Sequence, residues 1–216
     1  MGGYGQFCAV ARAHQALGGR WTLLVVRELL CGSSRFNDIR RGIPRISRTM
    51  LSERLHGLIA AGAVRQEGGA YRLTGAGQEL AGIVAALGTW GQRWLPRHAE
   101  REDIDLQPLL VDLQRRVNFA ALPKHPLVAR FQIKGHGPRM LLLRTAEVAL
   151  CTHNPGFPEV LVAGPLAALA GWWRGDFGWL EAQRRGLALE GPKALTRAFP
   201  RWFERYLFAG VQPAAA

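Results

Sequence analysis

The 216-residue sequence has little cysteine, little lysine and no long apolar run. Three cysteines, at positions 8, 31 and 151, are too few for a disulfide framework and cannot all pair within the chain. No apolar run approaches the roughly 18 residues that a membrane-spanning helix needs. The first residues also lack the basic and apolar regions of a secretory signal. We therefore expect a cytoplasmic protein without a membrane partner.

Motifs of catalysis and cofactor binding are missing as well. The sequence contains no phosphate-binding loop, dinucleotide fingerprint, GxSxG, CxxC or HExxH pattern. The six histidines are dispersed, and His153 near Cys151 is only a weak metal signal. Asp103 and Asp105 lie in a polar stretch, where they are more simply interpreted as solvated carboxylates than as catalytic residues. We expect no enzyme activity, cofactor or metal, because an active site would have to be assembled from scattered residues.

What the sequence does have is arginine, concentrated in its first half. The net charge is +12, and residues 1–98 contribute +8 of it through 13 Arg and no Lys against five acidic residues. Such a balance favours a polyanionic partner, nucleic acid first and an anionic membrane surface second. A compositional bias of the genome would also enrich arginine over lysine. The positions of the arginines along the chain must therefore decide between a polyanionic partner and a compositional bias.

Helical periodicity begins near the N-terminus. Apolar residues at helical spacing predict helices over 8–18 and 22–32, and Gly18-Gly19 separates them. Ser34 can cap a short third helix, which Pro44 ends because proline disfavours helical geometry at the preceding residue.

Residues 47–62 carry the most informative pattern. Ser47 is the expected N-cap, and four apolar side chains, among them Leu51 and Leu55, fall on one helical face. The opposite face carries polar residues with an arginine on each flank, namely Thr49, Ser52, Glu53 and His56, with Arg48 and Arg54. Hydroxyls and guanidiniums of this kind suit contacts to base edges and phosphates. An ordinary solvated helix face would show the same amphipathicity.

A basic hairpin follows this helix. Residues 63–74 alternate apolar and polar, with Gly68-Gly69 as a tight turn between the strands. This order of helices and hairpin is typical of a winged helix-turn-helix, whose second helix enters the major groove while the wing follows the backbone or minor groove. The predicted DNA-contacting residues are Arg35, Arg45, Ser47, Arg48, Thr49, Ser52, Arg54, His56, Arg65 and Arg72.

Several segments agree in order and spacing with one known family. A near-N-terminal Cys8, GGRWTLLVVREL, RFNDIRRGI and ISRTMLSERLHGL, followed by a small residue and a hairpin, resemble the HxlR-type bacterial transcriptional regulators over roughly residues 5–95. The resemblance implies a homodimer that binds a two-fold operator in double-stranded DNA. One departure is the short wing.

The segment 74–98 predicts a long helix that Thr74 caps. Its apolar residues form a seam suited to packing against another helix, made of Leu80, Val84, Leu87, Trp90 and Trp94. In the resembling family this helix and the N-terminal helix make the dimer interface; packing on the second domain is the alternative. We expect dimerisation, because a dimer doubles the contact across half-sites about one helical turn apart.

Cys8 is a candidate sensor. It stands at a helix start with Arg12 one turn on, so the helix dipole and the guanidinium should both lower the pKa of the thiol. An exposed thiol of low pKa suits redox sensing, and the resemblance implies sensing of oxidants or aldehydes at this position. A small packed side chain is the alternative. Cys31 and Cys151 lie in apolar segments and are expected to be buried.

A charged stretch suggests a linker over 99–107, between domains at 1–98 and 108–210. The second domain is predicted to be an antiparallel sheet with helices on one side, which makes the whole chain α+β. Strands are expected over 127–133, 139–145, 147–152, 159–164 and 187–191, and helices over 165–175, 175–186 and 192–210.

The run VLVAGPLAALAGWWRGDFGWLEAQRRGLALEGPKALTRAFPRWF resembles the sterol-carrier-protein type 2-like lipid-binding domain, over roughly residues 105–208. The resemblance implies an apolar small-molecule or lipid ligand held between sheet and helices. The aromatic residues proposed to line that site are Trp172, Trp173, Phe177, Trp179, Phe199, Trp202 and Phe203. Filling a core is the alternative for each of them. Trp172 and Trp173 are adjacent on one helix, so at least one is expected to face a second surface.

The sequence therefore predicts a dimeric, sequence-specific transcriptional regulator. An apolar ligand in the second domain, or oxidation of Cys8, would shift it between two states. The alternative is a lipid carrier whose winged helix makes protein contacts. That alternative predicts a neutral or acidic recognition face, whereas the arginines at 40, 41, 45, 48 and 54 cluster there.

Overall fold

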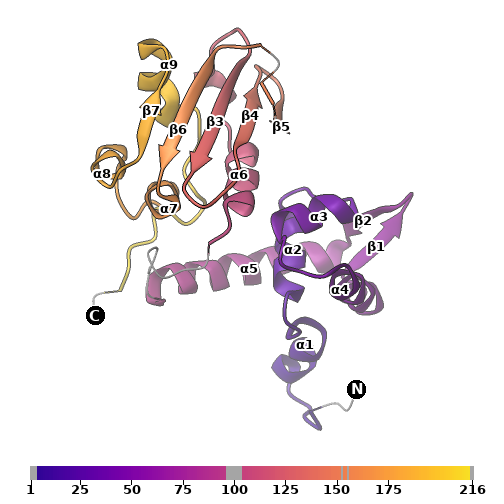
Figure 1. Cartoon of the computed structure of the whole chain (residues 1–216). Coiled ribbons are helices and arrows are strands. Elements are labelled where there is room, and N and C mark those ends of the chain that lie inside the picture. Colours follow the sequence, from indigo (N-terminus) through magenta and orange to yellow (C-terminus); the bar gives the residue numbers. More distant parts are fainter. Residues whose placement is uncertain (1–3, 96–103, 152, 155, 215–216) are drawn as a thin grey trace. The chain divides into compact units, whose positions relative to one another are not determined.

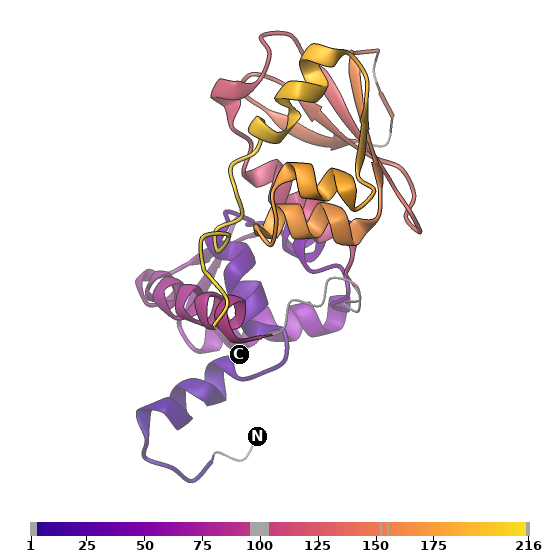
Figure 2. The same cartoon turned by 90° about the vertical axis from the view of Figure 1, so that its left-hand side faces the viewer.

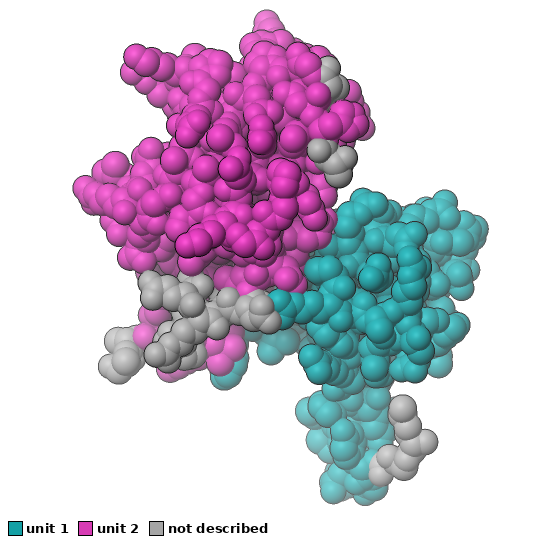
Figure 3. All heavy atoms as spheres, in the orientation of Figure 1, with its two compact units in different colours: residues 1–90 teal, residues 91–216 magenta. Residues whose placement is uncertain are grey.

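The computed structural model describes residues 4–95, 104–151, 153–154 and 156–214 (Figure 1). It divides into two compact units, residues 1–90 and 91–216, and each has its own hydrophobic core (Figure 3). The division falls within the long helix that the sequence places wholly in the first domain. Residues 99–103 of the predicted linker lie outside the described residues, and a helix already begins at Leu106.

Unit 1 contains the elements that the sequence predicts. They are α1 (Ala9–Leu17), α2 (Thr22–Leu30), α3 (Phe36–Gly42), α4 (Arg48–Ala60), β1 (Val64–Glu67), β2 (Ala70–Leu73) and α5 (Gly75–Trp94). The core forms where α2, α3 and α4 pack together, around side chains such as Val25, Ile39 and Leu55 that are almost fully buried. Burial of these apolar faces holds the short helices, since helices of this length are marginal in isolation.

Local signals fix the hairpin and the start of α5. Strands β1 and β2 pair antiparallel, and Gly68 and Gly69 both adopt positive φ, as a two-residue hairpin turn requires. Thr74 Oγ accepts a hydrogen bond from the Gly77 N–H at 3.2 Å and donates one to the Gly62 carbonyl at 2.6 Å. The predicted Thr74 cap is therefore confirmed, and it ties α5 to the end of α4.

Two local predictions in this unit are wrong. Ser34 does not cap α3: Arg35 holds the N-cap position without a side-chain cap, and the Ser34 carbonyl accepts the Tyr71 N–H at 2.8 Å. Ser34 thus connects α3 to the hairpin through its backbone. Cys31 is exposed rather than buried, because α2 ends at Leu30 and leaves Cys31 at the C-cap.

Unit 2 combines a five-stranded sheet with short helices. Its elements are α6 (Leu106–Arg115), β3 (Leu127–Ile133), β4 (Arg139–Leu143), β5 (Val148–Cys151), β6 (Glu159–Gly164), α7 (Leu166–Arg174), α8 (Trp179–Arg184), β7 (Ala188–Glu190) and α9 (Lys193–Ala198), with 3₁₀ turns η1 (Phe119–Ala121) and η2 (Phe199–Arg201). The helices supply the core on the sheet face that carries Ala129 and Phe131. Figure 2 shows α7 to α9, orange to yellow, together on one side of the strands.

The sheet is mixed, which corrects the prediction of an antiparallel sheet. Its strand order is β5-β4-β3-β6-β7, and β3 pairs parallel with β6 while the other pairs are antiparallel. After β5 the chain crosses back to the free edge of β3 and runs in the same direction as β3. Periodicity reports which residues are buried, but it carries no information about which strand becomes the neighbour.

The predicted helix over 192–210 ends early. Helix α9 stops at Ala198, and the turn η2 contains Pro200, which has no N–H to donate to a continuing helix. The chain then pairs with a remote segment, because the Asn118 N–H donates to the Trp202 carbonyl at 2.8 Å and the Glu204 N–H donates to the Arg116 carbonyl at 2.7 Å. This pairing draws the residues after Trp202 alongside the helices of unit 2.

Candidate nucleic-acid interface and aromatic pocket

Helix α4 is fixed by its cap and by its buried face. Ser47 Oγ accepts the Met50 N–H at 3.1 Å, which confirms the predicted N-cap. Leu51, Leu55 and Leu58 are each at most 1% exposed, so the rotation of the helix about its axis is set by the core. The opposite face of α4 is therefore presented to solvent.

Most of the predicted DNA-contacting side chains lie at the surface of unit 1. The exposed ones are Arg35, Arg45, Ser47, Arg48, Thr49, His56, Arg65 and Arg72, and the half-buried ones are Ser52 and Arg54. We define the recognition ridge as Ser47, Arg48, Thr49, Ser52 and His56, which share α4 and its cap. Exposed Glu53 belongs to the same face; a carboxylate can accept from the cytosine amino group but repels phosphate.

Arg54 is not brought together with the recognition ridge. At helical spacing its Cα lies roughly 140° around α4 from Thr49. Its Nη2 contacts Met50 Sδ at 2.9 Å, and its guanidinium lies against Gly19, between α1 and α2. Arg54 therefore packs one side of α4 against the preceding helices.

The wing is held by a contact that the sequence did not reveal. Arg35 Nη1 donates a hydrogen bond to the Gly68 carbonyl at 2.9 Å, so this guanidinium fixes the tip of the hairpin. Arg65 and Arg72 face each other in the β1–β2 register. Arg65 forms an ion pair with Glu67 at 2.8 Å, whereas Arg72 makes no ion pair within the described part of the chain.

Helices α1 and α5 also expose apolar side chains. Phe7 and Val10 are 98% and 76% exposed, and α1 contains no buried residue. Along the predicted seam of α5, Leu80 and Val84 pack against the core, but the later members are exposed. These exposed seam residues are Leu87, Trp90 and Trp94, and Ile83 is exposed beside them. Large exposed apolar side chains are common at sites where proteins contact a partner.

Cys8 is exposed at the N-cap position of α1. The backbone N–H of Ala11, and after it that of Val10, lower the pKa of the Cys8 thiol below its usual value. The predicted direction holds, but its cause is the backbone at the helix start rather than the guanidinium of Arg12. Cys151 is half-buried at the edge strand β5.

In unit 2 the predicted aromatic residues form one cluster. The Trp172 ring lies 5.0 Å from Trp179, 6.1 Å from Phe199 and 6.5 Å from Phe203, between ring centroids. Phe199 and Trp202 are fully buried in the core. The cluster therefore combines core residues with residues around a pocket.

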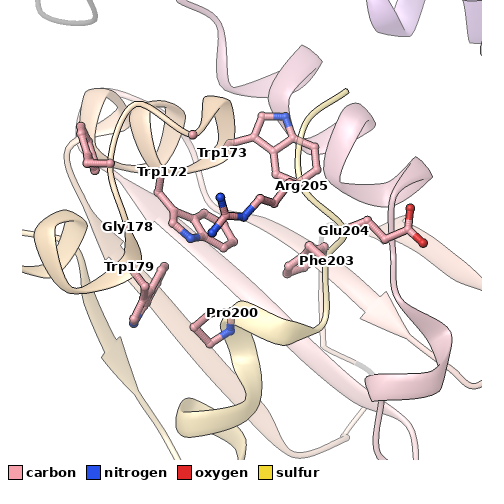
Figure 4. Close-up of a pocket in the computed structure, with 10 residues that line it drawn as sticks. Trp172, Trp173, Gly178, Trp179, Pro200, Phe203, Glu204 and Arg205 are labelled. Carbon is pink, nitrogen blue, oxygen red and sulfur yellow. The ribbon is translucent and has the colours of Figure 1, made fainter. Parts of the chain in front are cut away.

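The pocket has a volume of about 160 Å³ (Figure 4). Its lining residues are Trp172, Trp173, Gly175, Phe177, Gly178, Trp179, Pro200, Phe203, Glu204 and Arg205. Both Trp172 and Trp173 line it, which corrects the expectation that one of them faces a second surface. The reason is the segment after α9, which packs against α7 beside both rings. The sequence missed Pro200, Glu204 and Arg205, although Pro200 is a sign that the predicted helix breaks there.

Within the described residues, no three side chains among His, Cys, Asp and Glu lie close enough to hold a metal ion together. No helix within the same residues has the length and apolarity needed to cross a bilayer.

A helix-turn-helix followed by a two-stranded hairpin defines unit 1 as a winged helix-turn-helix. Residues 16–99 match the family model described as HxlR-like helix-turn-helix. An uncharacterized HTH-type transcriptional regulator of Mycobacterium tuberculosis is 38% identical over 96 residues, which cover 41% of this chain and 60% of the relative. Another, YvaP of Bacillus subtilis, is 35% identical over 91 residues, which cover 39% of this chain and 84% of YvaP.

The chain belongs to the HxlR-like helix-turn-helix family. It spans only 60% of the length of the mycobacterial relative. Among solved structures, the quinone-bound YodB from B. subtilis is similar, with 34% identity, a TM-score of 0.36, and coverage of 38% of this chain and 93% of that chain. The family match ends at residue 99, so the described residues from Ile104 onward lie outside it.

Proposed function

We propose that this protein is a transcriptional regulator that binds a double-stranded operator with α4 in the major groove. The recognition ridge is the observation that supports this most strongly, because a rigidly capped helix presents hydroxyl, imidazole and guanidinium groups to solvent. Exposed Arg65 and Arg72 on the adjacent wing suit contacts to the DNA backbone. These arginines also disfavour the alternative of a carrier whose winged helix contacts proteins.

Within this proposal the ridge residues have different roles. Arg48 and Thr49 project from the first turn of α4, the part of a recognition helix that reaches base edges. If Arg48 reads a base, Arg48→Ala should cost about 1–3 kcal/mol and relax specificity at one position; if it contacts phosphate alone, binding should weaken on all sequences alike. Arg54, which packs toward α1 and α2, is proposed to stabilise α4 instead.

We further propose that two copies associate through the exposed apolar side chains of α1 and α5. A second copy would cover residues such as Val10, Leu87 and Trp90 and would repeat the recognition ridge at a two-fold related position. Sedimentation velocity tests this: Leu87→Glu should produce monomers, while the matched change Gln78→Glu, at an exposed polar position of α5, should leave dimers. A Leu87→Glu dimer of unchanged stability would refute the assignment of the interface.

For unit 2 we propose an effector role, with an apolar ligand in the pocket beside Trp172. The sterol-carrier-like interpretation belongs to this proposal, and the aromatic walls support it. The volume of about 160 Å³ lies below the roughly 300–1,000 Å³ of pockets for drug-sized ligands, so it favours a ligand much smaller than a sterol. Oxidation of Cys8 is proposed as a second input, since the pKa of this exposed thiol is lowered.

Fluorescence anisotropy with duplexes from the DNA that flanks the protein's own gene tests the main proposal. We expect one duplex to bind more tightly than a scrambled duplex of equal length, and the preference to be lost in Thr49→Ala and Arg48→Ala. Binding without sequence preference and without dependence on salt would overturn the proposal.

A further inference from the structure

The pocket in unit 2 has flat aromatic walls. Trp172 and Trp179 meet edge to face with centroids 5.0 Å apart, and Trp172 and Phe203 meet at a similar angle at 6.5 Å. Aromatic rings attract further rings in edge-to-face or offset contacts at separations of about 4.5–7 Å. The walls therefore favour a planar aromatic body over a flexible chain.

The volume sets the size of this body. A cavity of about 150 Å³ lined by apolar side chains is known to take up benzene. The pocket, at about 160 Å³, is in the same range and falls well below what a drug-sized ligand needs. One ring with a small substituent fits such a space.

The charged side chains at the pocket indicate which chemical group the ring of the ligand carries. Arg205 lines the pocket and makes no ion pair among the described residues, whereas Glu204 is paired with Arg116 at 3.5 Å. In Figure 4 the Arg205 guanidinium extends toward the pocket, while the Glu204 carboxylate points away from it. The Arg116 Nε also donates to the Arg205 carbonyl at 2.6 Å, which holds the backbone at this residue. A planar guanidinium beside aromatic walls suits a carboxylate, which it can bind through two parallel hydrogen bonds.

We propose that this pocket binds a single-ring aromatic carboxylate, with its ring among Trp172, Trp179 and Phe203 and its carboxylate on Arg205. Binding itself is independent of DNA recognition. Only the further consequence, that the ligand changes operator affinity, rests on the effector role proposed for unit 2, and it requires different ligand affinities for the two states.

Isothermal titration of the full chain with benzoate as the probe tests the binding step. Benzoate should bind. Benzamide has the same shape without the charge, and its affinity should be lower than that of benzoate by a factor of about ten or more. Arg205→Gln should weaken benzoate binding to a similar degree. Arg201→Gln is the matched control, because Arg201 is exposed on η2 and does not line the pocket.

The outcomes separate the possibilities. Absence of benzoate binding, equal binding of benzamide, or an Arg205→Gln variant that binds benzoate normally would each overturn the proposal. Tight binding of palmitate or cholesterol in place of benzoate would do so as well, in favour of a lipid site. Fluorescence anisotropy with the operator then tests the effect on DNA binding separately. If benzoate binds but leaves the affinity for DNA unchanged, the effector role of unit 2 alone is refuted. If the protein binds no DNA with or without benzoate, the proposed function as a DNA-binding regulator is refuted.

Discussion

Arg72→Gln on the wing should reduce the dependence of DNA binding on salt by a calculable amount. Arg72 is exposed and makes no ion pair in the described part of the chain, so its full charge is available to a phosphate. Each phosphate contact contributes about 0.9 to the slope of log K against log salt concentration on B-DNA. A dimer loses two such contacts, and the slope should therefore become less steep by about 1.8.

Anisotropy titrations between about 50 and 200 mM salt measure this slope directly. Lys134→Gln is the matched control, because Lys134 is an exposed cation in unit 2 that the proposed interface does not use. The affinity of Arg72→Gln should fall similarly on specific and scrambled duplexes, since phosphate contacts carry no sequence information. An unchanged slope in Arg72→Gln, or an equal change in Lys134→Gln, would refute the placement of the wing on the DNA backbone.

Three further outcomes are expected. Arg35→Ala removes the hydrogen bond to the Gly68 carbonyl, so amide hydrogen exchange in residues 64–73 should accelerate while α4 stays protected. Leu55→Ala should lower the free energy of unfolding of unit 1 by about 2–5 kcal/mol in urea titrations, because Leu55 is 1% exposed in the core. Alkylation of Cys8 should reach its midpoint at lower pH in the folded chain than in urea, because the helix start lowers the pKa of the thiol. The same shift stabilises the folded chain at pH values above the unfolded pKa, and this contribution is lost as pH falls through the folded pKa.

Each of these three has a control or a result that would contradict it. Arg41→Ala, at an exposed arginine of α3, should leave amide exchange in the hairpin unchanged. Equal acceleration in Arg41→Ala and Arg35→Ala would contradict the conclusion that Arg35 fixes the tip of the hairpin. A loss below about 1 kcal/mol in Leu55→Ala would contradict the packing of α4. Alkylation is best followed in a variant with Cys31 and Cys151 replaced by Ser, and identical midpoints in the folded chain and in urea would contradict the effect of the helix start.

Local chemistry made most of unit 1 predictable. The Ser47 and Thr74 caps and the positive-φ pair Gly68-Gly69 each depend on residues a few positions apart, so the sequence contains the whole signal. The ridge on α4 was predictable for the same reason, because apolar spacing determines which face is buried.

Contacts between remote segments were not predictable. The parallel pairing of β3 with β6 joins strands that two others separate in sequence, and the pairing near Trp202 brings in residues of the segment after α6. Arg35 and Arg54 look equivalent to other arginines in the sequence, yet one holds the wing tip and the other packs against Gly19. The position of Arg205 over the pocket depends on where the predicted helix breaks, which required the three-dimensional path of the chain.

Hydroxyl-radical footprinting on the flanking DNA tests most directly whether α4 is presented twice per assembly to successive turns of a duplex. We expect two protected segments of equal strength, related by two-fold symmetry, with centres about 10 base pairs apart. Both should disappear together in Leu87→Glu, which we expect to prevent pairing of the two copies. A single protected segment, or two segments that persist in the monomeric variant, would contradict this mode of DNA recognition.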